Sequence, residues 1–398
     1  MVPEIRRQYN SEFTPDKYAA FLRELNNIHP GQLDFRIAET PLFIPKEFID
    51  KALEACESIV DTITEPEYKE WSNKALPQNL GLLNEGAHPQ CIVFDYGICT
   101  NEAGELEPQL IELQGFPSMF AFQVFFAETH QRHFFQPAGY TPYLNGFTKD
   151  SYTELLRRII LGNSQPENVI LLEIFPEKQK TRIDFSCTET LVGIKTVCLT
   201  ALTREGKDLY YMNDGEKTQI ERIYNRVIFD DLYHQPKEIQ EMGSIFQQEL
   251  NVEWIPHPAW FYRISKFTLP YINHPFVPPT RFLSDVDVLP TDLENYVVKP
   301  LFSFAGQGVI IDVTEEAIKK IEDPKNWILQ KKVTYAPIIE TPGEGAKAEI
   351  RLFYFWEPGT ARPLAANNLA RLSKGKMVGV RYNKDKEWVG GTFCLFEE

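Results

Sequence analysis

The sequence predicts a mixed α/β protein of the α+β kind, with a small parallel sheet between a helical N-terminal region and a strand-rich C-terminal region. Three observations predict this fold class. Apolar residues recur three and four positions apart within 12–75, which is the period of amphipathic helices. A strand, a helix and a second strand follow one another from Asn168, and this succession implies a parallel sheet. Short strands with inward charged residues fill the last third, which is typical of antiparallel sheets around a polar cleft.

The N-terminal elements are predicted from caps, periodicity and turn residues. In TPDKYAAFLRELNNI, Thr14 is a capping residue and Pro15 takes the first helical position, where proline is favoured. The segment IPKEFIDKALEACESIVDTI repeats the apolar pattern of a helix. A hairpin with inward acids is predicted next, with strands over 91–99 and 108–114 and a turn at 101–104.

The middle of the chain changes period. The apolar segment after Pro117 is predicted to be helical to about His130, and 140–165 to be a connector and a helix. NVILLEIFP and KTVCLTAL are predicted strands on either side of the helix KTRIDFSCTETLVGI. A hairpin turns at 213–215, where Asn-Asp-Gly favours a tight turn, and a further strand and a helical stretch near 235–250 follow.

Composition limits the classes of function. The 398 residues carry a formal net charge of −15, which repels nucleic acid and anionic membranes, so neither is an expected partner. An acidic surface suits a cationic substrate such as an amine, but it also serves solubility alone. Six cysteines without a C-x-x-C pair or a His cluster make zinc improbable and indicate reduced thiols. The N-terminus lacks a signal-peptide core and no apolar stretch is long enough for a membrane span, so we expect a soluble cytoplasmic protein.

The stretch YVVKPLFSFAGQGVIIDV predicts a strand, a glycine-rich loop and a second strand. Lys299 at the strand end supplies positive charge, and Gly306 and Gly308 let a backbone approach a phosphate closely. No Gly-Lys-Ser/Thr follows, and a strand rather than a helix is predicted after the loop, so neither common phosphate-binding fingerprint applies. Taken alone, the same residues are also consistent with a solvated lysine beside a glycine-containing hairpin.

Further polar residues follow in an order that favours a binding site. WILQKKV is a predicted edge strand ending at Gln330 and Lys331, and AEIRLF places Glu349 and Arg351 on one side of a strand. Arg371 stands in AANNLARLS, ahead of a predicted Gly-Gly turn at 390–391. Lys266 stands upstream in RISKFTL.

Together these motifs resemble the ATP-grasp superfamily and, more closely, its circularly permuted branch that includes glutathionylspermidine synthase. The resemblance covers most of 90–398. It implies that Lys299 and a loop matching 302–308 clamp the phosphates of ATP, that Lys266 after Ser265 is a second nucleotide lysine, and that Gln330 and Lys331 lie by the adenine. The loop residues that it assigns are Phe302, Ser303, Ala305, Gly306, Gln307 and Gly308.

The resemblance also implies a division of the chain and a metal site. A helical segment with the acidic hairpin spans 1–150, a small Rossmann-like domain spans 151–258, and the nucleotide-binding domain spans 259–398. Asp95 and Glu112 match the aspartate and glutamate of the family's Mg²⁺ site, and Gln114 stands where the family has an asparagine; carboxylate and amide oxygens suit a hard cation. Val93 stands where the family has an arginine that stabilises phosphoryl transfer, so Arg351 or Arg371 is expected to substitute.

The expected function is ATP- and Mg²⁺-dependent ligation of a carboxylate to an amine through an acyl phosphate, with small-molecule substrates of the peptide or polyamine classes. Arg351, Arg371 and Arg226, the counterpart of a family strand arginine, are the expected catalytic residues. Two alternatives stay open: an ATP-binding scaffold or regulator without turnover, favoured by Val93 and Gln114, and a phosphotransferase. A serine hydrolase lacks its Gly-x-Ser-x-Gly elbow. Ser118 is predicted to cap a helix, with substrate contact as the other interpretation.

Overall fold

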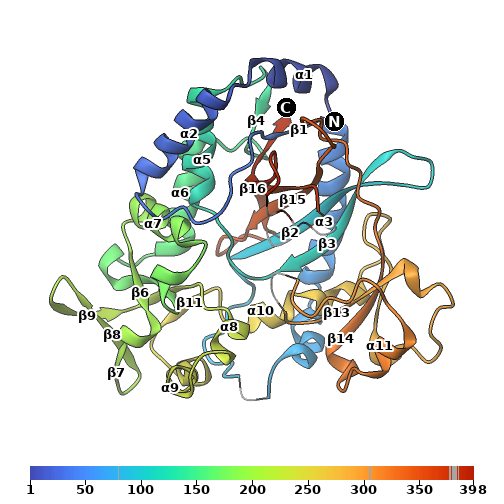
Figure 1. Cartoon of the computed structure of the whole chain (residues 1–398). Helices are drawn as coiled ribbons and strands as arrows, with labels where there is room; N and C mark the ends of the chain where they lie inside the picture. Colours follow the sequence, from blue (N-terminus) through green and yellow to red (C-terminus); the bar gives the residue numbers. More distant parts are fainter. Residues whose placement is uncertain (79, 304–305, 376–377, 379–382, 384) are drawn as a thin grey trace.

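A five-stranded antiparallel sheet lies at the centre of the computed structural model, which describes residues 1–398 except 79, 304–305, 376–377, 379–382 and 384 (Figure 1). Its strand order is β17-β16-β15-β2-β3. The bounds are β2 (Cys91–Thr100), β3 (Leu106–Gln114), β15 (Lys347–Phe355), β16 (Leu364–Ser373) and β17 (Gly390–Thr392). The predicted hairpin is thus confirmed, and the predicted C-terminal strands are present and extend the same sheet, which the sequence did not indicate.

Alternation along β2 explains how the sheet is buried on both faces. Ile92 and Phe94 point to one face, where they pack with α3 (Lys46–Thr64), while Val93 points to the other. That second face packs against α5 (Phe122–His133) and α6 (Lys149–Leu161). Val93 is fully buried in this apolar layer, so the position where the resemblance expects an arginine is occupied by core.

The predicted parallel sheet is present, with the order β11-β10-β5-β6. Its strands are β5 (Val169–Glu173), β6 (Lys195–Cys198), β10 (Arg222–Asn225) and β11 (Glu253–Ile255), all paired in parallel. Helix α7 (Arg182–Val192) connects β5 to β6 and ends at Gly193, whose positive φ of 88° suits a helix C-terminus. The predicted succession of strand, helix and strand is therefore confirmed.

A third sheet, with the order β12-β14-β13, carries the lysine strand. Its strands are β12 (Thr280–Phe282), β13 (Tyr296–Pro300) and β14 (Trp327–Lys331), and the short helix α11 (Glu315–Lys319) follows the glycine loop. Two predictions were wrong here. Strand β14 is central rather than an edge, because β12 pairs with its second side. The segment after Gly308 forms a single bridge, Ile310 to Val298, instead of a strand, because the turn brings only Ile310 back to β13.

The N-terminal region is held to the C-terminal end of the chain. Strand β1 (Leu42–Ile44), which the sequence did not indicate, pairs in parallel with β18 (Cys394–Glu397), and β4 (Tyr140–Thr141) pairs with the other side of β18. The predicted Gly-Gly turn is part of β17, because Gly390 lets this strand approach the carbonyl of Arg36 at a distance that a Cβ would obstruct.

The remaining elements lie around these sheets (Figure 1). Thr14 caps α2 (Pro15–Ile28) by accepting a hydrogen bond from the Lys17 amide, as predicted. The small antiparallel sheet β7-β8-β9 comprises Thr203–Glu205, Asp208–Asn213 and Glu216–Ile220. The other helices are α1 (Pro3–Glu12), α4 (Tyr68–Trp71), α8 (Phe229–Tyr233), α9 (Lys237–Met242) and α10 (Ala259–Arg263). Within the described ranges, no helix combines the length and apolar character needed to cross a membrane.

Candidate functional site

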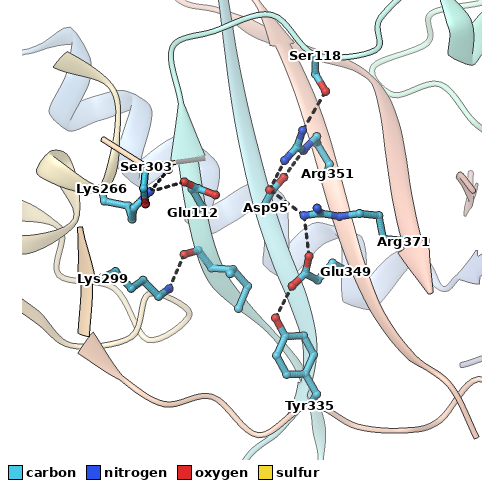
Figure 2. Close-up of polar contacts among 11 residues, drawn as sticks. Asp95, Glu112, Ser118, Lys266, Lys299, Ser303, Tyr335, Glu349, Arg351 and Arg371 are labelled. Carbon is cyan, nitrogen blue, oxygen red and sulfur yellow. Dashed lines mark hydrogen bonds and ion pairs between the residues drawn. The ribbon is translucent and has the colours of Figure 1, made fainter. Parts of the chain in front are cut away.

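Three charged side chains form a row across the central sheet. Asp95 on β2 is the register partner of Glu112 on β3 and of Arg351 on β15, so all three project from the same face. Arg351 donates from Nε to Asp95 Oδ1 at 2.6 Å and from Nη2 to Oδ2 at 2.5 Å. Its Nη1 donates to Ser118 Oγ at 3.0 Å (Figure 2). The result is a bidentate, charge-assisted pair, the strongest common type of protein ion pair.

A second polar row lies beside the first. Glu349 and Arg371 are register partners on β15 and β16, and Arg371 Nη2 donates to Glu349 Oε2 at 2.8 Å. The Tyr335 hydroxyl donates to the other Glu349 oxygen at 2.5 Å. Arg371 also lies 3.4 Å from Asp95 Oδ2, which joins the two rows. The side chain of Arg371 is 37% exposed against 8% for Glu349, so the arginine forms the outer part of this row.

The opposite wall carries two lysines (Figure 2). Lys266, in a 3-10 helix over Lys266–Tyr271, places Nζ 2.7 Å from Glu112 Oε1 and 3.0 Å from the Ser303 carbonyl. Burial alone would raise the pKa of the Glu112 carboxyl, but the charge and hydrogen bond of Lys266 outweigh it and lower that pKa. Glu112 is therefore an ionised acid facing the lysine wall.

Lys299 differs from Lys266 in its partners. Its Nζ donates to Gln330 Oε1 at 2.6 Å and to the Ile111 carbonyl at 3.1 Å, both neutral oxygens. Among the described residues, no carboxylate lies within ion-pair distance of it. Burial lowers the pKa of Lys299 to about 8. The ammonium of this half-buried lysine is therefore held by neutral oxygens alone among the described residues.

The space beside Lys266 is small in this conformation. A pocket of about 20 Å³ lies between the central sheet and the loop after β13, bordered by Gln114, Phe116 and Phe302. That volume holds roughly one water molecule, so this pocket would have to widen to admit a larger ligand. The Ser303 Oγ is buried there and has no hydrogen-bond partner among the described residues. A much larger cavity, of about 780 Å³, lies elsewhere, between α3, α5 and β18.

The loop residues singled out from the sequence are placed in part. Gly306 and Gly308 have φ angles of 70° and 71°, so both occupy the left-handed region that glycine favours. Phe302 packs its ring 5.1 Å from that of Tyr262, which anchors the start of the loop. Gln307 is exposed. Ala305 lies outside the described residues.

Three other predicted residues lie at the margin of the site. Lys331 is exposed, and its backbone amide bonds to the carbonyl of Pro279. Gln114 is half-buried on β3, two residues beyond Glu112 and on the same face. Arg226 is buried behind Ser118: it donates to the Ser118 carbonyl and lies 3.5 Å from Asp184.

The predicted role of Ser118 as a helix cap is not found in the structure. Helix α5 begins at Phe122 with Ala121 as its N-cap and no side-chain cap, so the cap prediction is wrong. The Ser118 side chain instead accepts from Arg351, and its carbonyl accepts from Arg226. Tyr335 and Thr280 were also missed. Their contacts, to Glu349 and Gln330, cross between separate segments and leave no local sequence signal.

The acids at the centre of the site fit a magnesium ion bound with a nucleotide. Among the residues that the structure describes, no group of three or more His, Cys, Asp or Glu side chains converges as a metal cluster would. Mg²⁺ in nucleotide sites, however, is usually held by one or two carboxylates together with substrate phosphates. Asp95 and Glu112 supply two carboxylates on adjacent strands, and Gln114 adds an amide oxygen on the same face.

Comparison with known proteins gives a result for the fold alone. No family model matches the chain. Among solved structures, the chain is similar to a glutathione synthetase-like effector from Globodera pallida in the apo form, with a TM-score of 0.60 and 11% sequence identity. The similarity covers 97% of this chain and 98% of that one. At this identity the likeness concerns architecture and not activity. The chain therefore has an ATP-grasp-like α/β fold with a parallel-sheet unit.

Proposed function

We propose that this site binds ATP and uses it to join a carboxylate to an amine. The observation that carries the proposal is Lys299, a half-buried lysine whose ammonium is held by two neutral oxygens, with a buried lysine, Lys266, on the same wall. Four formal positive charges meet three negative ones in the site, on Lys266, Lys299, Arg351 and Arg371 against Asp95, Glu112 and Glu349. A locally positive site is unexpected in a chain of net charge −15. The binding of a triphosphate would account for it, because the phosphates need positive charge around them.

The side chains of the two walls have separable tasks in this proposal. Lys266 and Lys299 bind phosphate oxygens, and the glycine loop provides backbone N–H donors close to them. Asp95, Glu112 and Gln114 would hold Mg²⁺, which when bound with ATP neutralises phosphate charge during phosphoryl transfer. Arg371, the outer guanidinium, orients the carboxylate that is to be activated. The apolar layer around Val93 limits the access of water from the other end of the sheet.

Finer assignments extend this proposal. We place the chain with the circularly permuted, glutathionylspermidine synthase-like ligases, with the division into 1–150, 151–258 and 259–398 and with an acyl phosphate as the activated species. The substrates would be a small carboxylate and an amine of the peptide or polyamine class. The six unpaired cysteines support a reducing, cytoplasmic setting.

Two titrations and one assay test the ligase proposal. Calorimetric titration with a nonhydrolysable ATP analogue, with and without Mg²⁺, should show binding that Lys299→Met weakens by about 100-fold. Phosphate release from ATP should then depend on adding both a carboxylate and an amine. ADP formed with phosphate retained on an acceptor would instead indicate a phosphotransferase. Absence of nucleotide binding in the wild-type chain would remove the proposal altogether.

One observation favours a second candidate, a nucleotide-binding protein without turnover. Val93 lies in the core where the resemblance expects a transfer-stabilising arginine, and Arg351 is held against Asp95. A chain of this kind would bind ATP and release no phosphate with any acceptor. Binding without amine-dependent phosphate release, across peptides and polyamines, would support this candidate over the ligase.

A further inference from the structure

The carboxylate of Asp95 is already fully engaged by arginine. Arg351 contacts both of its oxygens, at 2.6 and 2.5 Å, and Arg371 lies 3.4 Å from Oδ2. The side chain of Asp95 is only 3% exposed, so water does not compete for these oxygens. A divalent ion must therefore displace a bidentate guanidinium from a buried site before it can bind Asp95.

Glu112 is engaged in a different way. Lys266 contacts one of its oxygens, at 2.7 Å, and the Glu112 side chain is 27% exposed. A single-point contact to a partly exposed acid is weaker than the bidentate pair at Asp95. Of the two carboxylates proposed for Mg²⁺, Asp95 is thus the more strongly held, and Arg351 determines whether it is available to the metal.

We infer that Arg351 excludes divalent cations from the free protein and yields Asp95 only when a nucleotide is present. The inference rests on the proposed nucleotide site. A triphosphate offers the guanidinium an alternative bidentate anion, so Arg351 exchanges one partner for another and Asp95 becomes free for the metal. Metal and nucleotide then bind with positive coupling, and the coupling is reciprocal by linkage.

The contacts of Arg351 support an exchange of partners. Its third contact is Ser118 Oγ, a neutral acceptor at 3.0 Å, and its side chain is 17% exposed, so it reaches the open side of the sheet. Arg263 shows the contrasting case. It is 1% exposed and binds both oxygens of Glu85 as well as Ser72 and Asn73, as expected of a fixed structural pair.

The test measures Mn²⁺ binding to the full-length chain by electron paramagnetic resonance, with no nucleotide present. The wild type should bind Mn²⁺ weakly at this site, and Arg351→Gln should bind it at least about tenfold more tightly. Because Arg371 can reach Asp95, the double variant Arg351→Gln/Arg371→Gln is measured as well. Adding Asp95→Asn to either variant should remove the gain. The matched control is Arg362→Gln, an arginine paired with Glu57 and Asp61 away from the site.

Two results would overturn the inference: equal Mn²⁺ affinity in the wild type and the Arg351 variants, or a gain that survives Asp95→Asn. If the Arg351 variants fail to fold, the wild type is used for the test. A nonhydrolysable ATP analogue should raise the Mn²⁺ affinity of the wild type by tenfold or more. An unchanged Mn²⁺ affinity would contradict the exchange of partners. Titration of the analogue without metal is run beside it. Failure of the analogue to bind would count against the nucleotide site, whereas Mn²⁺ binding to the free variants tests Arg351 independently.

Discussion

Lys299 Nζ lies 2.6 Å from the side-chain oxygen of Gln330, and the amide nitrogen of the same glutamine donates to Thr280 Oγ1 at 3.0 Å. Lys299 and Gln330 stand on adjacent strands of the three-stranded sheet, and Thr280 is the register partner of Gln330 on the far side. Because the Thr280 contact fixes which end of the amide faces the lysine, Gln330 acts as an oriented acceptor that holds the Lys299 ammonium in place. Its side chain is therefore engaged by Lys299 and Thr280, and its predicted place beside the adenine stays a prediction.

Replacing Gln330 should weaken nucleotide binding through its effect on Lys299, without Gln330 itself contacting the nucleotide. Gln330→Met leaves the Lys299 ammonium with the Ile111 carbonyl as its remaining acceptor among the described residues. A hydrogen bond to a charged group contributes about 1.5–3 kcal/mol, so affinity for an ATP analogue should fall by roughly tenfold or more. Calorimetry measures it, and Thr280→Val should produce a smaller loss. An unchanged affinity in Gln330→Met would show that the lysine needs no such support.

Replacing Lys299 should affect the stability of the free protein and its affinity for nucleotide differently. Lys299→Met keeps the length of the side chain and removes an ammonium whose burial is unfavourable. We expect the apparent Tm of the free protein to stay level or rise, while affinity for the ATP analogue falls by about 100-fold, since a triphosphate charge loses its partner. Differential scanning fluorimetry with and without the analogue reads both effects. A fall in Tm with intact binding would indicate a structural lysine.

The lowered pKa of Lys299 predicts a pH dependence with a definite sign. Burial lowers the pKa from 10.5 to about 8 in the folded chain. Between these values the unfolded chain binds more protons than the folded chain, so this group makes the free energy of unfolding rise as pH rises from about 8 to 10.5. Affinity for the ATP analogue should fall over the same range, because binding favours the charged lysine. Urea unfolding and calorimetry at pH 7.5 and 9.5, compared between wild type and Lys299→Met, measure both trends, and the variant should show neither contribution.

The strands of the site could be predicted because each carries its own pattern. Alternation placed Glu349 and Arg351 on one face, and both reach the site from that face of β15. The partner strand could not be predicted, because period two specifies a face and not a neighbour. The irregularity of register after Asp95, which accompanies the pairing of Asp95 with Glu112 and Arg351, likewise has no local signal.

The errors have physical causes of the same kind. Strand β14 was read as an edge because β12 has only three residues after a proline pair, too short for a periodic signal. Ser118 follows Pro117 and precedes an apolar segment, which resembles a helix start, yet α5 begins only at Phe122. Tertiary contacts with Arg351 and Arg226 determine where Ser118 points, and no short-range rule contains them.

Ser118→Ala distinguishes a residue of the site from a helix cap. Loss of a cap costs typically about 1 kcal/mol of stability, whereas Ser118 caps nothing, and Arg351 keeps both contacts to Asp95 without it. We therefore expect a change in the free energy of unfolding below about 0.5 kcal/mol, measured by urea titration. Loss of the Oγ acceptor frees one guanidinium nitrogen, so the affinity for the ATP analogue should change by severalfold. A stability loss with unchanged affinity would contradict a role for Ser118 in the site.

Arg226 should prove structural when it is replaced. Its guanidinium is buried between Asp184, at 3.5 Å, and the Ser118 carbonyl, and burial raises the pKa of Asp184 to about 6. Removing one partner of a buried ion pair leaves an unpaired charge and typically costs about 3–5 kcal/mol. Arg226→Met should therefore lower the free energy of unfolding by that order at pH 7.5. Because lower pH favours the neutral form of the stranded acid, the defect should shrink toward pH 5.5, and Asp184→Asn added to Arg226→Met should recover part of it at pH 7.5. If Arg226 instead binds a reacting group, Arg226→Met will keep wild-type stability and lose activity, and no recovery by the second substitution will be seen.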